Sequence, residues 1–263
     1  MPLAVCLEWG DRISAILLIE PDSTLFHTAL TVLDLSKILE NPSFRVVLGE
    51  DLDRIEKVTF SILPNIAATK AVFLQEQNLR DRYATYFHSA RETLTSLFAR
   101  GQAEARFLSE WGEQIQENVW RNARLTLTCP DLASFAGMLA GVPAVLVSGG
   151  PSLTKDLEPL AELQPLPLII AVDTAHPVLQ RGGLQADIVA TCDPTPFNQR
   201  HFDAAVPNPD CVLVYDPETY FEIPQKWPGP RVVLNPGESP TCAWFNCLKG
   251  IVDAPRKPLS VAH

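Results

Sequence analysis

The sequence predicts an α/β protein whose second half is a parallel-sheet, Rossmann-like nucleotide-binding domain. The first observation is the segment VLVSGGPSL at 145–153, in which apolar strand formers run into two glycines and a proline. The second is a regular alternation of short apolar strands with helical segments, typical of a parallel sheet covered on both faces. The third is that polar residues follow three of these strands, where parallel sheets bind ligands.

The first 70 residues predict a partial Rossmann-like unit. A buried strand is expected at 15–20, followed by a helix to about Leu33 and a second strand at 45–48. Glu20 ends the first strand, where dinucleotide-binding folds place a carboxylate that binds ribose. No G-x-G-x-x-G precedes Glu20, so a structural role is the favoured interpretation of its side chain.

Residues 71–140 predict a helical connecting segment. The helical pattern extends from 72 to about 125, Gly101 is expected to divide it, and a further helix is expected at 131–139. Aromatic and aliphatic side chains recur at helical spacing, and core packing is favoured for them over contact with a cofactor. These side chains are Tyr83, Phe87, Trp111, Ile115 and Val119.

The nucleotide-binding α/β domain is predicted over 141–252, and it is expected to be incomplete. Strands are expected at 145–147, 168–172, 187–190 and 212–214, with helices at 153–163 and 177–180. Beyond Leu234 proline and glycine become frequent, and one short helix is expected near 242–248. The polar tail at 253–263 is expected to be disordered.

The residues Ser148–Ser152, here called the glycine corner, predict a phosphate site. Gly149 and Gly150 allow a sharp turn and a close approach to a ligand, because neither carries a Cβ atom. Pro151 presets φ for the first turn of a helix, and Ser152 is expected to cap that helix. The N–H groups and the positive dipole end of the helix would then face a bound phosphate.

Asp173 and Asp193 each follow an apolar strand, in the segments IIAVD and IVATCD. A carboxylate at a strand end can hold Mg²⁺, accept hydrogen bonds from a ribose, or simply cap the following turn. Because Asp193 shares its expected sheet edge with the glycine corner, a ligand or metal role is favoured for it. Asp187 precedes its strand, so a loop-capping role at the opposite end of the sheet is favoured there.

His176 and His201 are the histidines nearest to the predicted site. Either could act as a general base, but nothing in their spacing singles one out, and a structural role is favoured for both. The general base therefore stays unidentified. The chain has no G-x-x-x-x-G-K-[ST], H-E-x-x-H or G-x-S-x-G, so P-loop NTPase, zincin and α/β-hydrolase functions lack support.

The composition of the chain indicates which binding partners and which cellular compartment to expect. A net charge of −10 without a dense cluster of Lys and Arg argues against nucleic acid as a partner. No apolar run is long enough to span a membrane, and the N-terminus has no signal-peptide pattern, so a cytoplasmic protein with no membrane contact is expected. The 6 cysteines show no CxxC spacing and are expected to be buried, reduced thiols.

Several segments, in order, resemble one family. They are SGGPSL at 148–153, the stretch IIAVDTAHPVLQRGGLQADIVATCDPTPFNQRHF at 169–202, and the upstream LLIEPDSTLFHTAL and VVLGED. The chain is similar to the family that unites bacterial motility accessory factors with archaeal 6-hydroxymethylpterin pyrophosphokinase-like enzymes. Family members begin with a glycine-rich strand-turn and continue well past this length, so a truncated member is expected.

The resemblance implies a sialyltransferase-like domain for a CMP-activated sugar, with Mg²⁺ as a potential cofactor. It implies transfer of pseudaminic or legionaminic acid to Ser or Thr of flagellin. On this sequence Gly149, Gly150, Pro151 and Ser152 would contact the CMP phosphate or ribose, Asp173 and Thr174 would lie beside the nucleotide, and Asp193 would contact the donor or the metal. Two alternatives stay open: a 6-hydroxymethylpterin pyrophosphokinase that uses ATP and Mg²⁺, and a non-catalytic nucleotide-binding or flagellin-associated module.

Overall fold

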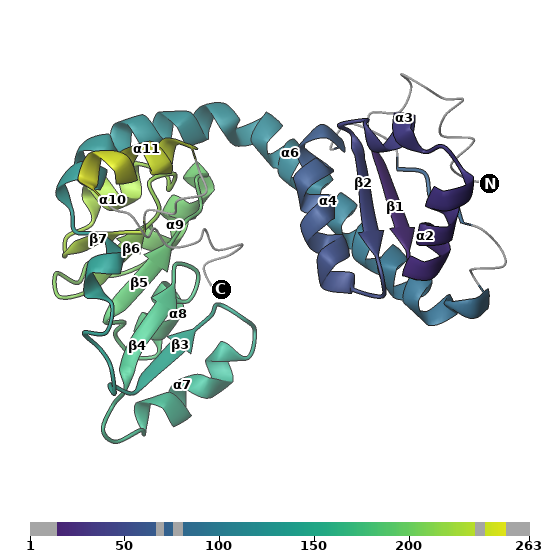
Figure 1. Cartoon of the computed structure of the whole chain (residues 1–263). Coiled ribbons are helices and arrows are strands. Elements are labelled where there is room, and N and C mark those ends of the chain that lie inside the picture. Colours follow the sequence, from purple (N-terminus) through teal and green to yellow (C-terminus); the bar gives the residue numbers. More distant parts are fainter. Residues whose placement is uncertain (1–14, 67–70, 76–80, 235–239, 251–263) are drawn as a thin grey trace. The chain divides into compact units, whose positions relative to one another are not determined.

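The computed structural model describes residues 15–66, 71–75, 81–234 and 240–250 (Figure 1). The chain divides into two compact units, Met1–Ser109 and Glu110–His263. The division falls inside the segment for which the sequence predicts helical structure. The tail at 253–263, predicted to be disordered, lies outside the described residues.

The N-terminal unit is a small α/β structure around two parallel strands. Its elements are β1 Ile16–Glu20, α2 Ser23–Val32, α3 Ser36–Leu39, β2 Phe44–Leu48, α4 Leu52–Ile66 and the first part of α6 Ala84–Thr128. Val47 of β2, Ile55 of α4 and Leu94 of α6 are buried together in its core. The predicted strand–helix–strand order is thus confirmed, and Tyr83 and Phe87 pack against this core as expected.

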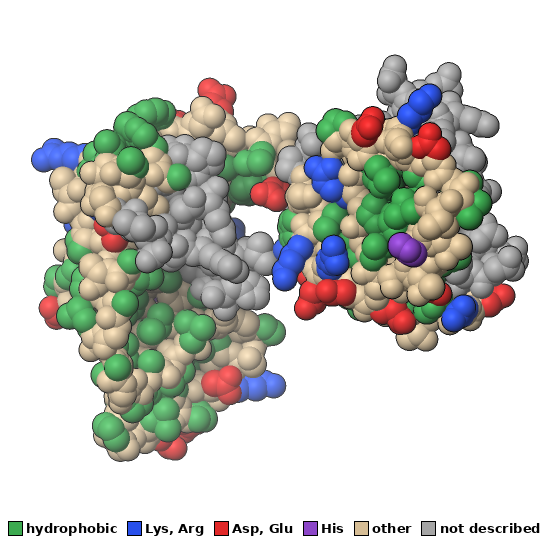
Figure 2. Space-filling view, in the orientation of Figure 1, with side chains coloured by type: hydrophobic (Ala, Val, Ile, Leu, Met, Phe, Trp, Pro, Cys, Tyr) green, Lys and Arg blue, Asp and Glu red, His purple; other side chains and the backbone are tan. Residues whose placement is uncertain are grey.

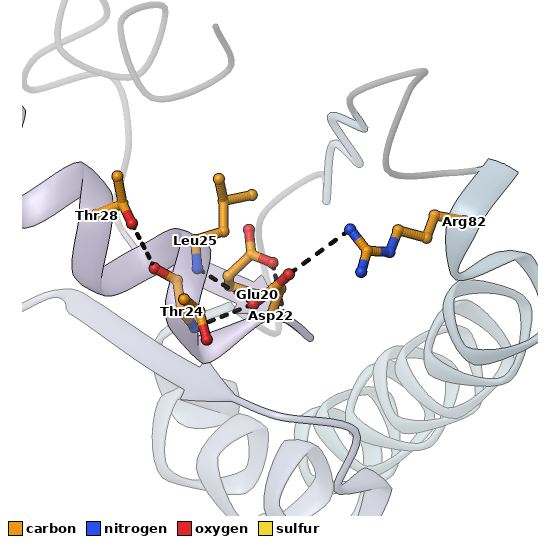
Figure 3. Close-up of polar contacts among 6 residues, drawn as sticks. All are labelled: Glu20, Asp22, Thr24, Leu25, Thr28 and Arg82. Carbon is orange, nitrogen blue, oxygen red and sulfur yellow. Dashed lines mark hydrogen bonds and ion pairs between the residues drawn. The ribbon is translucent and has the colours of Figure 1, made fainter.

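The turn from β1 into α2 explains Glu20 (Figure 3). Oε1 of Glu20 accepts a hydrogen bond from the N–H of Asp22 at 2.9 Å, which keeps the carboxylate inside its own turn. Oδ1 of Asp22 accepts from the N–H groups of Thr24 and Leu25 and so caps α2. Arg82 places a guanidinium nitrogen 3.9 Å from Asp22. The bond to Asp22 supports the structural interpretation of Glu20.

Three predictions for the connecting segment are wrong. Residues 71–75 are not helical, although helical structure is expected from 72. Helix α6 runs without a break through Gly101, because a single glycine weakens a long helix without ending it. The helix expected at 131–139 is only a 3-10 turn, η2 Leu132–Phe135. Gly137 and Gly141 adopt φ of 79° and 81°, left-handed values that end helical structure.

The C-terminal unit is built on a five-stranded parallel sheet with the order β3-β4-β5-β6-β7. The strands are β3 Ala144–Val147, β4 Leu168–Val172, β5 Ile188–Thr191, β6 Val212–Tyr215 and β7 Arg231–Val233. Helices and turns connect them: α7 Leu153–Ala161, α8 His176–Arg181, η3 Pro196–Asn198, α9 Gln199–Asp203 and α10 Glu222–Lys226, with α11 Pro240–Lys249 after β7. The mixed α/β fold and the parallel sheet are confirmed, while β7 was not predicted.

The sequential strand order fixes where the helices lie. Each crossover joins neighbouring parallel strands and is expected to be right-handed, so the connecting helices share one face of the sheet. Consistent with this, α7 contacts α8, α8 contacts α9, and α9 contacts α10. Leu125 and Cys129, at the end of α6, pack against the same hydrophobic core. The core includes Ile169, Val189 and Leu213, one from each central strand and all fully buried.

The first strand of this sheet is less covered than the others. Leu146 of β3 is 60% exposed and Val142 just before it is also exposed, whereas β4, β5 and β6 have no exposed residue. Hydrophobic side chains are visible over the part of the unit that holds β3 and α7 (Figure 2). The predicted covering of both faces therefore describes the centre of the sheet but not β3.

Candidate functional site

The parallel strands bring the predicted site residues to one edge of the sheet. Because β3, β4 and β5 run in the same direction, Ser148, Asp173 and Asp193 follow their carboxyl ends at the same rim (Figure 1). Within the described sheet no reversal of strand order creates a switch point, so the whole edge, rather than one crevice, is the candidate site. The register places Asp193 two strands from the glycine corner, about 10 Å at the usual strand spacing.

Gly149 lies directly against Thr174. A Cβ atom at Gly149 would be 2.4 Å from Oγ1 and 2.8 Å from Cβ of Thr174, so no other residue fits without movement. A Cβ atom at Gly150 would meet nothing within 4 Å, and Gly150 is exposed. Packing against Thr174 therefore requires a glycine at position 149. Gly150 has no such packing constraint and leaves open space at the edge of the sheet.

Ser152 does not cap α7 as predicted. Its φ of −73° and ψ of −24° are already helical, and its side chain makes no capping hydrogen bond. A capping serine needs extended backbone angles to turn its oxygen back onto the first N–H groups, which explains the difference. The turn is closed by the backbone instead, since the N–H of Leu153 donates to the carbonyl of Gly150 at 3.1 Å. Ser148 to Ser152 are all exposed.

Asp173 is buried, and its carboxylate accepts hydrogen bonds from the turn after β4, from the end of β5 and from η3. Its Oδ2 accepts hydrogen bonds from Oγ1 of Thr191 at 2.9 Å and from Nδ2 of Asn198 at 3.0 Å. Its Oδ1 accepts from the N–H of Thr174 at 2.7 Å. The carboxylate therefore fixes the backbone of Thr174, whose own side chain is exposed beside Gly149. Direct contact of Asp173 with a nucleotide stays a prediction.

Asp193 is half-buried and shapes the loop after β5. Its Oδ1 accepts from the N–H of Thr195 at 2.8 Å, a side-chain turn of the kind that aspartate favours before proline. Its carbonyl accepts from the N–H of Tyr220 at 3.1 Å. Among the described residues, no group of three or more His, Cys, Asp or Glu side chains could hold a metal ion. Any metal at Asp193 would thus need further ligands from phosphate oxygens or water.

His176, His201 and Asp187 each contact other residues of the C-terminal unit. His176 is 2% exposed and packs against Trp227 with ring centroids 5.9 Å apart, and burial lowers the pKa of its imidazole. His201 lies on α9, where its Nε2 accepts from Nε of Arg200 at 3.3 Å. Oδ2 of Asp187 accepts from the N–H of Ile169 at the opposite end of the sheet, which confirms the loop-capping interpretation.

Three buried polar residues next to this edge were not predicted from the sequence. Asn118 and Asn122 of α6 are fully buried, and each donates two hydrogen bonds to loop carbonyls. Asn118 donates to the loops after β5 and β6, and Asn122 donates to the loop after β6. Asp216 follows β6, and its Oδ1 accepts from the N–H of Glu218 at 2.8 Å. The segment VLVYD repeats the pattern of apolar strand and aspartate, so Asp216 was detectable from the sequence.

The cysteine prediction holds in part. The described cysteines Cys129, Cys192, Cys211 and Cys247 are thiols, and the side chains of Cys6 and Cys242 lie outside the described residues. Cys211 is buried, and burial raises the pKa of its thiol to about 12. Cys247 is exposed, contrary to expectation. In the described part of the chain, no helix is both long and apolar enough to span a membrane.

The fold and this edge define a Rossmann-like α/β protein with its candidate ligand site at the carboxyl ends of parallel strands. Residues 117–263, more than half of the chain, match the family described as 6-hydroxymethylpterin diphosphokinase MptE-like. The chain belongs to this MptE-like family. A comparison with curated proteins gives no match.

One solved structure shares the fold. The MAf glycosyltransferase from Magnetospirillum magneticum AMB-1 superposes with a TM-score of 0.54 at 17% sequence identity. The similarity covers 88% of this chain and 37% of that chain. The chain thus spans little more than a third of the length of this structural relative, and the similarity extends beyond the residues matched by the family.

Proposed function

We propose that this chain is a glycosyltransferase-like protein of the motility accessory type, which transfers a CMP-activated nonulosonic acid, pseudaminic or legionaminic, to Ser or Thr of flagellin. The contact between Gly149 and Thr174 carries the proposal, because it aligns an exposed glycine corner with the next strand end. The breadth of the similarity to the MAf glycosyltransferase supports it, since that similarity covers 88% of the chain and includes part of the N-terminal unit.

The edge offers complementary groups to a nucleotide phosphate. The N–H groups of Gly149 and Gly150 and the positive end of α7 would face the phosphate. The exposed hydroxyl of Thr174 and the carboxylate of Asp193 would contact the ribose or the donor. In the transfer, the bond from the anomeric carbon to the phosphate oxygen breaks and a bond to the acceptor oxygen forms. The acceptor proton goes to a base, and the helix end stabilises the departing phosphate.

Mg²⁺ fits this site only if the phosphate of the bound sugar donor supplies further ligands. Asp193 supplies one carboxylate, and Mg²⁺ commonly binds one or two carboxylates together with substrate phosphates and water. A bound Mg²⁺ would neutralise phosphate charge. Asp193 would hold it, while Thr174 and the glycine corner would orient the nucleotide.

A second candidate is a 6-hydroxymethylpterin diphosphokinase that uses ATP and Mg²⁺. The description of the matching family favours it. The same glycine corner would then bind the phosphates of ATP. A non-catalytic nucleotide-binding or flagellin-associated module is the third candidate, since the chain spans 37% of the MAf structure.

Calorimetric titration with CMP, a CMP-nonulosonate and ATP tests the proposal. We expect CMP and the CMP-sugar to bind and ATP to bind at least about tenfold more weakly, a difference near 1.4 kcal/mol. Preferential binding of ATP would support the diphosphokinase. Binding of CMP without a mass shift on flagellin, when the protein is incubated with CMP-nonulosonate, would support the non-catalytic module.

The substitution Gly150→Ala locates the phosphate. A Cβ atom there meets nothing within 4 Å, so the thermal midpoint should not change. If the phosphate lies on the glycine corner, the added methyl group should weaken CMP binding by about tenfold. Gly112→Ala in α6 is the matched control, since its Cβ atom also meets nothing within 4 Å. Equal CMP affinity in both variants would remove the glycine corner from the site.

A further inference from the structure

Two asparagines on α6 hold the loops at the carboxyl edge of the sheet. Asn118 and Asn122 are four residues apart on the same helical face, and both are fully buried. Nδ2 of Asn118 donates to the carbonyls of Pro194 at 2.8 Å and Glu218 at 2.9 Å. Nδ2 of Asn122 donates to the carbonyls of Pro217 at 3.1 Å and Thr219 at 2.8 Å.

The two asparagines differ in which loop they reach. Asn122 contacts only the loop after β6, whereas Asn118 joins that loop to the loop after β5. Pro194, the partner of Asn118, stands between Asp193 and Thr195, the two ends of the side-chain turn. Asn118 therefore bonds directly to the backbone that carries Asp193. Asn122 reaches Asp193 only through the Thr219–Tyr220 peptide, whose N–H donates to the carbonyl of Asp193 at 3.1 Å.

The hydrogen bonds of Asn118 require an amide. Both N–H bonds of Nδ2 are used, and Oδ1 accepts from Nε2 of Gln114 at 3.0 Å and from the N–H of Phe221 at 3.4 Å. A carboxylate cannot donate to the two carbonyls, and an aliphatic side chain would leave them buried without partners. A mid-helix asparagine is a poor helix former, so its position is better explained by these bonds than by α6 itself.

We propose that Asn118 is a positioning residue of the nucleotide site. It holds the turn Asp193–Thr195 in register with the glycine corner, so that the Asp193 carboxylate is presented at the ligand edge. The inference rests on the proposed function for the identity of the ligand. Its geometric part, the control of the Asp193 turn by Asn118, stands on the hydrogen bonds alone.

The experiment compares Asn118→Ala with Asn122→Ala in the full chain. The variants are matched, since both remove a fully buried amide with two carbonyl partners from the same helix. We expect the larger loss in thermal midpoint for Asn118→Ala, because only Asn118 also accepts hydrogen bonds through Oδ1. Asn118→Ala alone should weaken CMP binding by about tenfold, while Asn122→Ala should change it less than about twofold. Equal weakening in both variants would overturn the proposal, because it would reflect general destabilisation.

Amide hydrogen exchange provides a readout that needs no ligand. The N–H of Thr195 is bonded to Asp193, so its exchange should accelerate about tenfold in Asn118→Ala and less than about threefold in Asn122→Ala, which reaches Asp193 only indirectly. Unchanged exchange at Thr195 in Asn118→Ala would overturn the positioning role. If wild type binds no CMP but Thr195 loses protection as expected, the proposed function fails and the positioning of the turn stands.

A milder variant covers the case in which Asn118→Ala does not fold. Gln114→Ala removes only the hydrogen bond to Oδ1 of Asn118, and Gln114 is half-buried. A smaller acceleration at Thr195 in the same direction is expected. No change at Thr195, with the fold intact, would count against the proposal.

Discussion

Gly149 and Gly150 are neighbours, but they are glycines for different physical reasons. Gly149 packs against Thr174, and a Cβ atom there would be 2.8 Å from the Cβ of Thr174. Rotation of the threonine can move Oγ1 but not its Cβ, so the strand ends must separate. We expect Gly149→Ala to lower the free energy of unfolding by about 1–3 kcal/mol in urea titrations. Gly150→Ala should leave it unchanged, and equal stability of both variants would contradict the packing argument.

His176 should make stability depend on pH. Burial lowers the pKa of its imidazole below 6.5, so the unfolded chain takes up a proton before the folded chain does. Stability is therefore fully present above pH 6.5 and falls as the pH drops below it, until the folded pKa is reached. The slope for one proton is at most about 1.4 kcal/mol per pH unit.

The substitution His176→Phe isolates this contribution. Phenylalanine keeps a ring against Trp227, and Nδ1 of His176 has no hydrogen-bond partner among the described residues. We expect the variant to lose less stability than wild type between pH 7 and pH 5 in denaturant titrations. His201→Gln serves as the control, because His201 lies at a partly exposed position on α9. Parallel pH curves for wild type and His176→Phe would show that the imidazole is not the cause.

The predictability of the site also depends on single residues. Asp173 and Asp193 could be placed at one edge because each follows an apolar run, and strand ends of parallel strands meet. Asn118 could not, since its carbonyl partners lie 76 and 100 residues away along the chain. Such contacts leave no local pattern. Ser152 was assigned a capping bond from residue type alone, and its backbone angles decided otherwise.

Among the elements, α6 ends in a cap supplied by α11. Nζ of Lys249 donates to the carbonyls of Thr126 at 2.7 Å and Cys129 at 2.9 Å, and it forms an ion pair with Asp131. The side chains of Lys249 and Asp131 are only 12% and 13% exposed, so water screens this pair weakly. A cation at the carboxyl end of a helix also complements the helix dipole.

The substitution Lys249→Met should therefore be costly. It leaves the carbonyls of Thr126 and Cys129, in and just after the last turn of α6, and a mostly buried carboxylate without their partner. We expect a loss of about 2–3 kcal/mol in the free energy of unfolding. Lys226→Met is the control, because Lys226 pairs with Glu222 on an exposed surface of α10. Exposed pairs of this kind contribute little, so no measurable change is expected there. Similar losses in both variants would refute the capping role.

The strands that are covered along their whole length were predicted correctly from the sequence. The strands β4 and β6 are uninterrupted apolar runs, and β5 is apolar up to its last residue, Thr191. The predicted ranges of all three agree with the structure to within one residue at each end. The short β7 stands between Pro230 and the proline-rich segment after Leu234, so its three residues give no periodic signal. The region at 131–139 has helix-forming composition, and the left-handed Gly137 decides its structure.

At the scale of the whole molecule, the chain has separate hydrophobic cores. One core, with Val47 and Ile55, includes only residues of the N-terminal unit. Another, with Ile169 and Val189, includes only residues of the C-terminal unit. Helix α6 contributes to both, through Leu94 in the first and Leu125 in the second. Each unit thus carries its own source of stability, while every proposed site residue belongs to the second.

Calorimetric unfolding should therefore resolve two transitions that respond to different substitutions. Val47→Ala and Val189→Ala are matched, since both remove methyl groups from fully buried valines on strands, at a cost of about 2 kcal/mol each. Each substitution should lower the midpoint temperature of a different transition. CMP at 100 times its Kd should raise the midpoint temperature of only the transition that Val189→Ala destabilises. The shift corresponds to about 2.7 kcal/mol of added stability. A single transition lowered equally by both substitutions would show that the units unfold together. A ligand shift confined to the transition sensitive to Val47 would move the nucleotide site to the N-terminal unit.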